Sequence, residues 1–90
     1  MTTTQKLQIV NIKGLHARAS AKFAEVVESH DATATVSKDG LEACGDSIMG
    51  LLMLAASKGT YINVTTAGPE ADKLATAIAA LVADKFGEGN

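Results

Sequence analysis

Short stretches that alternate apolar and polar residues limit what this chain can fold into more than any other feature of its sequence. In "ATATVSK", residues 32–38, Ala34 and Val36 alternate with threonine and serine. The same alternation recurs in "TYINVTT", residues 60–66, and at the start of "QKLQIVNI", residues 5–12. Such strands form a sheet with one face on the core and the other in water. The sequence therefore predicts that every helix covers the same face of one sheet.

Apolar residues at helical spacing separate these strands. They predict helices over residues 17–29, 47–56 and 68–86, and a short strand over residues 41–44 follows the turn "KDG". The order of elements is then β-α-β-β-α-β-α. This order, with one sheet face in water, predicts an α+β fold of the open-faced β-sandwich type, with three helices on one face.

The apolar stripes of the helices predict the core. The predicted core residues of the first and last helices are Ala19, Phe23, Val26, Val27, Leu74, Ile78, Leu81, Val82 and Phe86. Gly40 is expected to take a positive φ in the hairpin turn. Residues 87–90, "GEGN", follow the last stripe and are expected to be a frayed tail.

Length and composition exclude several classes of protein. Ninety residues predict one domain, residues 1–90, because chains rarely split below about 150 residues. The net charge of −2, with acids and bases mixed along the chain, argues against a nucleic-acid binder. Lone Cys44 excludes an internal disulfide and fits a reducing compartment. The start of the chain lacks the pattern of a signal peptide, and the longest apolar run, residues 48–56, is about half of a bilayer span. We expect a cytoplasmic protein that does not enter a membrane.

The stretch "GLHARASAKF", residues 14–23, predicts an anion site. A helix that starts just after His16 leaves the first backbone N–H groups, including those of Ala17 and Arg18, without partners in the helix. These groups and the helix dipole attract an anion, and the Arg18 guanidinium suits phosphate oxygens. Gly14 allows the loop to approach its neighbours without a Cβ clash.

The same charges act on the histidine ring. The positive end of the helix disfavours the protonated ring, so His16 is expected to be a neutral imidazole with a nucleophilic lone pair. We therefore expect His16 to accept a phosphoryl group covalently; the alternative is a helix-capping or surface histidine. His16 and His30 lie fourteen residues apart on one helix. That separation is about 21 Å, so they cannot share a metal ion.

The motifs that the sequence lacks bear on the reaction. There is no Walker-type loop, no kinase-like lysine and aspartate set, and no carboxylate pair placed for Mg²⁺. We expect no metal and no cofactor. The chain is thus predicted to be a stoichiometric phosphate carrier rather than an enzyme.

A second candidate site lies in "GDSIMGLLMLAA", residues 45–56. Ser47 is expected to cap this helix, and Leu51, Met53 and Leu54 are expected to face the core. For Ile48, Met49 and Leu52 two interpretations remain open: they pack inside, or they form an exposed patch on which partner proteins dock.

Both motifs resemble those of the HPr family, the histidine-containing phosphocarriers of the bacterial phosphoenolpyruvate-dependent phosphotransferase system. "GLHARASAKF" resembles the family's active-site stretch, "SIMGLLMLAASKG" its second segment, and "TAGPEADKLATAIAAL" its last helix. The resemblance covers nearly the whole chain and implies a βαββαβα fold with a four-stranded antiparallel sheet. It also implies a monomer.

The resemblance assigns roles to individual residues. His16 would be phosphorylated on Nδ1 by an enzyme I-type protein and would pass the phosphate to EIIA-type domains. Ala17 and Arg18 would bind the phosphate. Ser47 corresponds to a serine that an HPr kinase/phosphorylase modifies in some members. The positions that dock partners would be Ile48, Met49 and Leu52.

Two positions depart from the family pattern. Ala19 stands where many members have proline, and Asp46 precedes Ser47 where many serine-regulated members have a basic residue. A carboxylate beside Ser47 would repel an added phosphate. These departures favour a regulatory branch of the system over dedicated sugar uptake.

Two other functions compete with the carrier. One is a regulatory adaptor that binds partners through residues 48–52 and is switched at Ser47. The other is an α+β sandwich that binds a small ligand or nucleic acid on the open sheet, for which Tyr61 is the only aromatic candidate. Gly14, His16 and Arg18 at one helix start argue against the adaptor, and the lack of a basic face or of several aromatic residues on the sheet argues against the second alternative.

Overall fold

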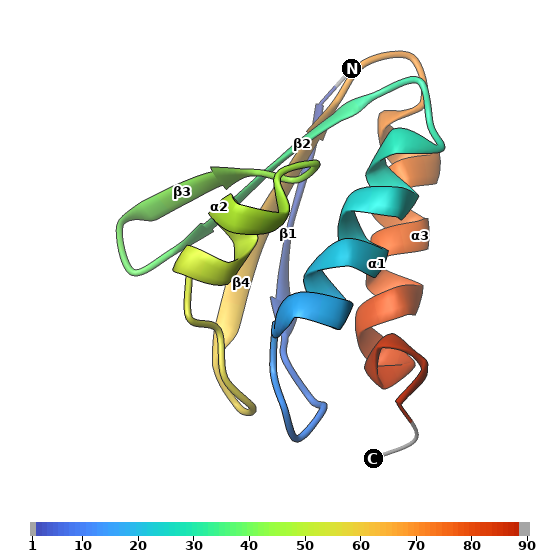
Figure 1. Cartoon of the computed structure of the whole chain (residues 1–90). Helices are drawn as coiled ribbons and strands as arrows, with labels where there is room; N and C mark the ends of the chain where they lie inside the picture. Colours follow the sequence, from blue (N-terminus) through green and yellow to red (C-terminus); the bar gives the residue numbers. More distant parts are fainter. Residues whose placement is uncertain (1, 89–90) are drawn as a thin grey trace.

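The computed structural model of the chain describes residues 2–88. Its elements are β1 (Thr2–Gln8), α1 (Ala17–Glu28), β2 (Thr33–Lys38), β3 (Leu41–Cys44), α2 (Ile48–Met53), β4 (Tyr61–Ala67), α3 (Ala71–Ala83) and a 3-10 turn, η1 (Lys85–Gly87) (Figure 1). The predicted order β-α-β-β-α-β-α is confirmed.

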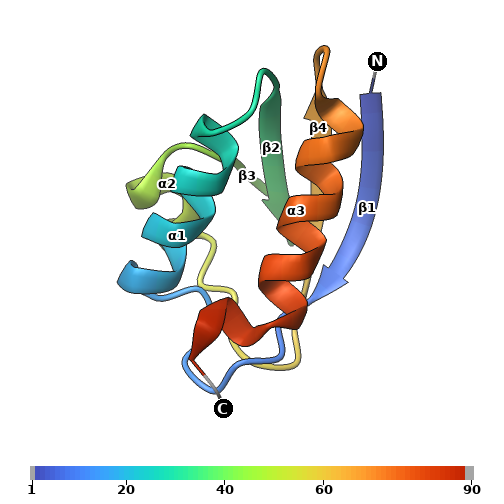
Figure 2. The ribbon, with the colours of Figure 1, turned by 90° about the vertical axis from the view of Figure 1, so that its right-hand side faces the viewer.

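The four strands form one antiparallel sheet in the order β1-β4-β2-β3. The helices α3 and α1 stand side by side on one side of this sheet (Figure 2), where α3 packs against β1 and β4, α2 packs against β3, and α1 contacts both other helices. The other sheet face carries exposed residues at alternate positions, as in β2 and β4. This is the predicted α+β open-faced β-sandwich with three helices on one face.

The core lies between the sheet and the helices. Val36, Ile62 and Val64 point inward from the strands and are fully buried. They meet the buried faces of α1 and α3, to which Phe23 and Leu74 belong. Burial of each such side chain stabilises the fold by about 1.5–3 kcal/mol. The inward residues of the strands are therefore those that the alternation predicted.

The hairpin between β2 and β3 has a two-residue loop. Lys38 pairs with Leu41, and the loop residues Asp39 and Gly40 have φ values of 51° and 83°. Two positive φ angles match the right-handed twist of the strands, and Asp-Gly is a favoured sequence for them. The expected positive φ at Gly40 is confirmed.

The first strand differs from its predicted bounds. It was expected over residues 5–12, but β1 begins at Thr2 and ends at Gln8. β-Branched threonines suit a strand, and Thr2 pairs with Ala67 of β4. The strand stops because the chain then turns: the N–H of Gly14 donates to the carbonyl of Asn11 at 3.2 Å. Residues 9–12 therefore lead into the loop before α1.

Two helices end earlier than predicted. Helix α2 ends at Met53, not near residue 56, and Ala55 has a φ of 51°. Met53 was expected in the core, but 74% of it is exposed, because the short helix turns only Leu51 inward. The last helix spans Ala71–Ala83 rather than residues 68–86.

The C-terminal segment is folded back on the protein rather than frayed. Phe86 is fully buried, as predicted, but it reaches the core from the 3-10 segment η1, with a φ of 54°, and not from the last α-helix. Its carbonyl accepts a hydrogen bond of 2.7 Å from Lys22 Nζ. Gly87 and Glu88 follow, and Glu88 contacts the loop before α1, so the predicted tail is wrong for these two residues. Residues 89–90 lie outside the described part of the chain.

The three helices are short. None of the helices in residues 2–88 has both the length and the hydropathy that a bilayer crossing requires.

Candidate functional site

Helix α1 begins without a side-chain cap. His16 is the N-cap residue, with extended backbone angles of −78° and −174°, and its ring makes no capping hydrogen bond. The N–H of Ser20 donates to the carbonyl of His16 at 2.8 Å. The N–H groups of Ala17 and Arg18 precede this bond and have no partner within the helix. The start of α1 therefore leaves these two N–H groups free, which is the arrangement on which the predicted anion site depends.

Gly14 fixes the path of the loop before α1. It has a φ of 64°, and a Cβ at this position would lie 2.4 Å from the carbonyl oxygen of Ala56. The next residue, Leu15, donates its N–H to the same oxygen at 2.8 Å. The expectation that Gly14 permits a close backbone approach is confirmed. This approach joins the start of α1 to the segment that follows α2.

A basic depression surrounds His16. Its lining residues are Lys13, His16, Ala17, Arg18, Lys22, Gly87 and Glu88. The side chain of His16 is 27% exposed, so a ligand can reach the ring. Among residues 2–88, the ion pairs leave the Arg18 guanidinium unoccupied. The depression therefore combines a reachable imidazole, helix N–H groups and an available guanidinium.

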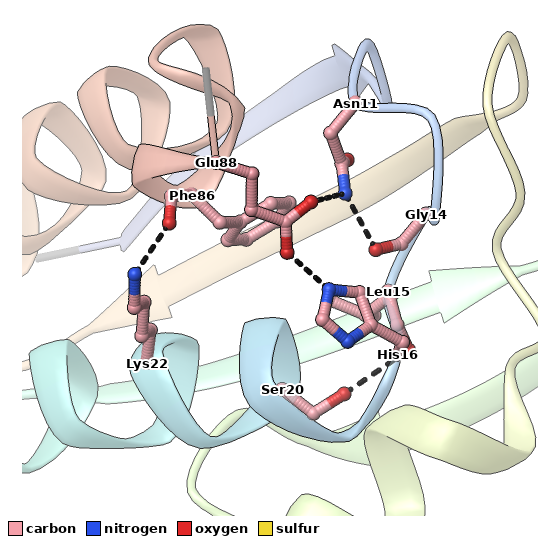
Figure 3. A network of polar contacts seen from close by, with 8 residues as sticks. All are labelled: Asn11, Gly14, Leu15, His16, Ser20, Lys22, Phe86 and Glu88. Carbon is pink, nitrogen blue, oxygen red and sulfur yellow. Dashed lines mark hydrogen bonds and ion pairs between the residues drawn. The ribbon is translucent and has the colours of Figure 1, made fainter. Parts of the chain in front are cut away.

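The carboxylate of Glu88 contacts the histidine ring. Its Oε2 atom lies against Nε2 of His16, and its Oε1 atom accepts a hydrogen bond of 3.0 Å from Asn11 Nδ2 (Figure 3). Asn11 is fully buried, and the same Nδ2 atom donates to the Gly14 carbonyl at 2.8 Å. The hydrogen bonds from Asn11 and then from His16 hold the pKa of the Glu88 carboxyl below its ordinary value.

Sequence reasoning missed both Asn11 and Glu88. Glu88 lies 72 residues from His16 and 77 residues from Asn11 along the chain. No spacing pattern links positions so far apart. The only local signal was a polar Asn11 at the end of an apolar strand, which also suits an ordinary turn.

Ala19 occupies the position where the family pattern has proline in many members. It is fully buried in the first turn of α1. Alanine is the best helix former, so α1 starts at Ala17 without a proline.

The predicted cap of α2 is confirmed. The N–H of Gly50 donates to Oγ of Ser47 at 3.1 Å. Asp46, directly before Ser47, is exposed. The Ser47 hydroxyl oxygen therefore already caps α2, and the carboxylate of Asp46 precedes it directly in the chain.

Of the three candidate docking residues, Leu52 lies beside His16. Ile48 and Met49 are 42% and 70% exposed, and Leu52 is half-buried. Leu52 lines one groove together with His16 and Leu15. The interpretation in which all three pack inside is therefore wrong for Ile48 and Met49, and the exposed apolar surface reaches the histidine through Leu52.

His30 lies at the opposite end of α1 from His16. Its Nδ1 atom lies 2.9 Å from the carbonyl of Val26 and must be the donor, because a carbonyl oxygen only accepts. No group of three or more metal-ligating side chains occurs within residues 2–88. Cys44 is an exposed free thiol.

Comparisons with known proteins all lead to one family. The family model described as "PTS HPr component phosphorylation site" matches residues 3–84. The phosphocarrier protein HPr of Neisseria meningitidis is 42% identical over 85 residues, which cover 94% of this chain and 96% of that protein. The phosphocarrier protein NPr of Escherichia coli K12 is 37% identical over 89 residues, 98% of this chain and 99% of that protein. A crystal structure of HPr-C-His from Thermoanaerobacter tengcongensis matches with a TM-score of 0.91 and 30% identity, covering 96% of this chain and 97% of that one.

Proposed function

The chain belongs to the HPr family of phosphotransferase-system phosphocarriers, and from that premise we propose that His16 is the residue that carries the phosphoryl group. In this proposal an enzyme I-type protein donates the group to Nδ1 of His16, and an EIIA-type domain receives it. The observation that carries the proposal is the reachable His16 ring at the uncapped start of α1. The protein is then a substrate of its partners and not itself an enzyme.

The transfer needs only groups that the site already contains. The Nδ1 lone pair attacks phosphorus, and the bond from phosphorus to the donor protein breaks with its electron pair staying on the donor atom. The new phosphoryl oxygens meet the N–H groups of Ala17 and Arg18 and the Arg18 guanidinium. Transfer to the acceptor reverses the first step and returns the lone pair to Nδ1.

The exposed apolar surface supports docking of protein partners. Ile48 and Met49 are exposed, and Leu52 joins them to the groove beside His16. A partner that covers this surface therefore also faces the imidazole. Methionine adapts its shape to different partners, which suits a carrier that must bind a donor and several acceptors in turn.

Regulation at Ser47 is the second part of the proposal. An HPr kinase/phosphorylase would add a phosphate to Oγ, next to Ile48 and Met49 in the docking surface. Glu or Asp at this position imitates the added charge, so Ser47→Asp should slow phosphoryl transfer from enzyme I about tenfold through weaker docking. Unchanged transfer kinetics would separate Ser47 from the donor interface.

The proposal also includes a monomer with one domain that works in the cytoplasm. A single species with the mass of one chain in analytical ultracentrifugation would support the monomer. A stable dimer at the micromolar concentrations of the transfer assay would contradict it.

The decisive test is a phosphorylation assay with a matched control. The protein is incubated with a bacterial enzyme I and ³²P-labelled phosphoenolpyruvate, beside the variants His16→Ala and His30→Ala. Label that is acid-labile, alkali-stable, absent from His16→Ala and present in His30→Ala would place phosphohistidine at His16.

The opposite result is equally informative. No label with several active enzyme I proteins would overturn the carrier proposal and favour an adaptor that binds partners without taking phosphate on histidine. Circular dichroism of His16→Ala must match the parent protein. A variant that fails to fold would make His16 a structural residue instead.

A further inference from the structure

The contact between Glu88 and His16 has a role that the carrier function alone does not assign. We propose that Glu88 is a positioning residue: its carboxylate holds the ring proton of His16 on Nε2 and thereby keeps Nδ1 free as the nucleophile. This inference rests on the proposed function of His16. Glu88 also lies beyond residues 3–84, the part of the chain that the family model matches.

The carboxylate is held in place from several sides. Asn11 donates to Oε1 at 3.0 Å, and Asn11 is itself buried and tied to the Gly14 carbonyl. On the other side, Phe86 is buried in the core, and its carbonyl accepts a bond from Lys22. The Glu88 side chain is only 13% exposed as a result. Both the carboxylate and the backbone that carries it are therefore fixed relative to the ring.

The hydrogen-bonding capacity of each group decides the position of the proton. An ionised carboxylate only accepts hydrogen bonds, so the ring nitrogen that faces it must donate. The nitrogen that faces Glu88 is Nε2. A neutral imidazole carries one proton, and with that proton on Nε2 the lone pair is on Nδ1. Figure 3 shows that Nδ1 points away from Glu88.

The same contact acts during the transfer. When Nδ1 bonds to phosphorus and the bond to the donor breaks, the imidazole gains positive charge. The proton stays on Nε2 and its hydrogen bond to Glu88 becomes charge-assisted on both sides. A carboxylate that orients a histidine and stabilises its positive charge has the same effect as the aspartate of a catalytic triad. No proton leaves the ring in either direction of the transfer.

The variant Glu88→Gln tests the inference because it changes chemistry and keeps shape. Asn11 Nδ2 can only donate, so it requires the amide oxygen of the new side chain. The amide nitrogen then faces His16 as a donor, and Nε2 must accept. The ring proton is therefore expected to move to Nδ1. In Glu88→Ala no group faces Nε2, so the ring proton is expected on either nitrogen.

The first readout is spectroscopic and needs no phosphate. ¹⁵N NMR of the histidine ring, at a pH where His16 is neutral, should show Nε2–H in the parent protein, Nδ1–H in Glu88→Gln and a mixture in Glu88→Ala. The matched control is Asp84→Asn, which removes the same charge from the same segment, where the side chain of Asp84 is exposed. It should leave the tautomer unchanged. The same tautomer in all four proteins would overturn the inference.

The second readout is the transfer rate. Glu88→Gln should lower the rate at saturating enzyme I about tenfold, the worth of one charge-assisted hydrogen bond. The enzyme I concentration that gives half of the maximal rate should stay the same. The transfer rate of Glu88→Ala should fall less than that of Glu88→Gln. Equal losses in the two variants would indicate a structural role and overturn the inference.

The two proposals can fail separately. If Glu88→Gln moves the proton but no variant takes phosphate, His16 is positioned and the carrier proposal is wrong. If all variants take phosphate at the parent rate and the tautomer does not change, His16 is a carrier and Glu88 does not position it.

Discussion

The two helices beside the groove begin in different ways. α1 and α2 both follow an N-cap residue with extended backbone, His16 and Ser47. Ser47 accepts a hydrogen bond from the N–H of Gly50, so α2 satisfies one of its free donors by itself. The His16 ring makes no such bond and contacts Glu88 instead.

This difference in capping determines whether a helix start contributes to stability or is free to bind a ligand. A side-chain cap stabilises a helix by occupying its N–H groups, and an uncapped start leaves those groups to a ligand. α1 has 12 residues and a full helix dipole, whereas α2 has 6. The N-terminal start of α1 is therefore suited to bind an anion, whereas the capped start of α2 stabilises a short helix.

The largest effect is expected from Arg18→Ala. In the proposed transfer the guanidinium is the charged partner of the phosphoryl group, so without it the transfer rate should fall about 100-fold, as for loss of one donor from an oxyanion hole. Arg18→Lys should recover part of the loss, because it keeps the charge but not the two-pronged geometry. Stopped-flow or quench-flow transfer from enzyme I measures both. A rate within threefold of the parent would show that the N–H groups of α1 suffice.

Gly14→Ala should cost about 2–4 kcal/mol of unfolding free energy, from a positive φ and a clash with Ala56. Gly40→Ala is the matched control, since Gly40 also has a positive φ but no heavy atom within 4 Å of its would-be Cβ. It should cost about 1–2 kcal/mol. Urea denaturation compares them. Equal losses of unfolding free energy in the two variants would mean that the loop before α1 shifts to accommodate the added methyl group.

Ser47→Ala should lower the free energy of unfolding by about 1 kcal/mol through loss of the cap. His16→Ala should cost less, because it removes no capping bond and only the contact of a partly exposed ring with Glu88. Differential scanning calorimetry of both variants checks the order. A larger loss in His16→Ala would assign the start of α1 a structural role and weaken the contrast between the two helices.

The smallest effect is expected from pH. The pKa of Glu88 is lowered by Asn11 and His16, with a smaller contribution from Lys13, so the ionised carboxylate stabilises the folded state. This contribution is complete above the ordinary glutamate value of 4.5 and is lost as the pH falls through the lower folded value.

Urea midpoints of the parent protein and Glu88→Gln should therefore differ near neutral pH and converge at acidic pH. For Asp84→Asn, the difference in urea midpoint from the parent protein should be the same at both pH values. A difference that persists at acidic pH would mean that the hydrogen bonds of Glu88 do not depend on its charge.

Much of the fold followed from local patterns in the sequence. The inward positions Val36, Ile62 and Val64 follow from the period of a strand, which any few residues display. The cap at Ser47 and the turn at Gly40 depend on neighbours within three or four residues. The start of α1 was predictable for the same reason. It places the close backbone contact at Gly14, the ring of His16 and the guanidinium of Arg18 within five residues of one another.

The places where prediction failed involve long-range contacts. Met53 was assigned to the core from helical spacing, but α2 is too short and too near the edge strand β3 to bury it. Phe86 was assigned correctly to the core but wrongly to a helix. The free energy gained by burying the Phe86 ring outweighs the cost of its positive φ. The sequence shows that the ring is apolar, but it does not show the backbone conformation that burial requires.

The sequence by itself determined the sheet faces, the order of the elements and the histidine at a free helix end, because each depends on residues within one or two turns. Only the tertiary structure decided that Glu88 and Asn11 meet His16 and that Leu52 lies in one groove with the ring. Those contacts join residues up to 77 positions apart. They form only when packing of the core closes the loops between them, and no local pattern records the result.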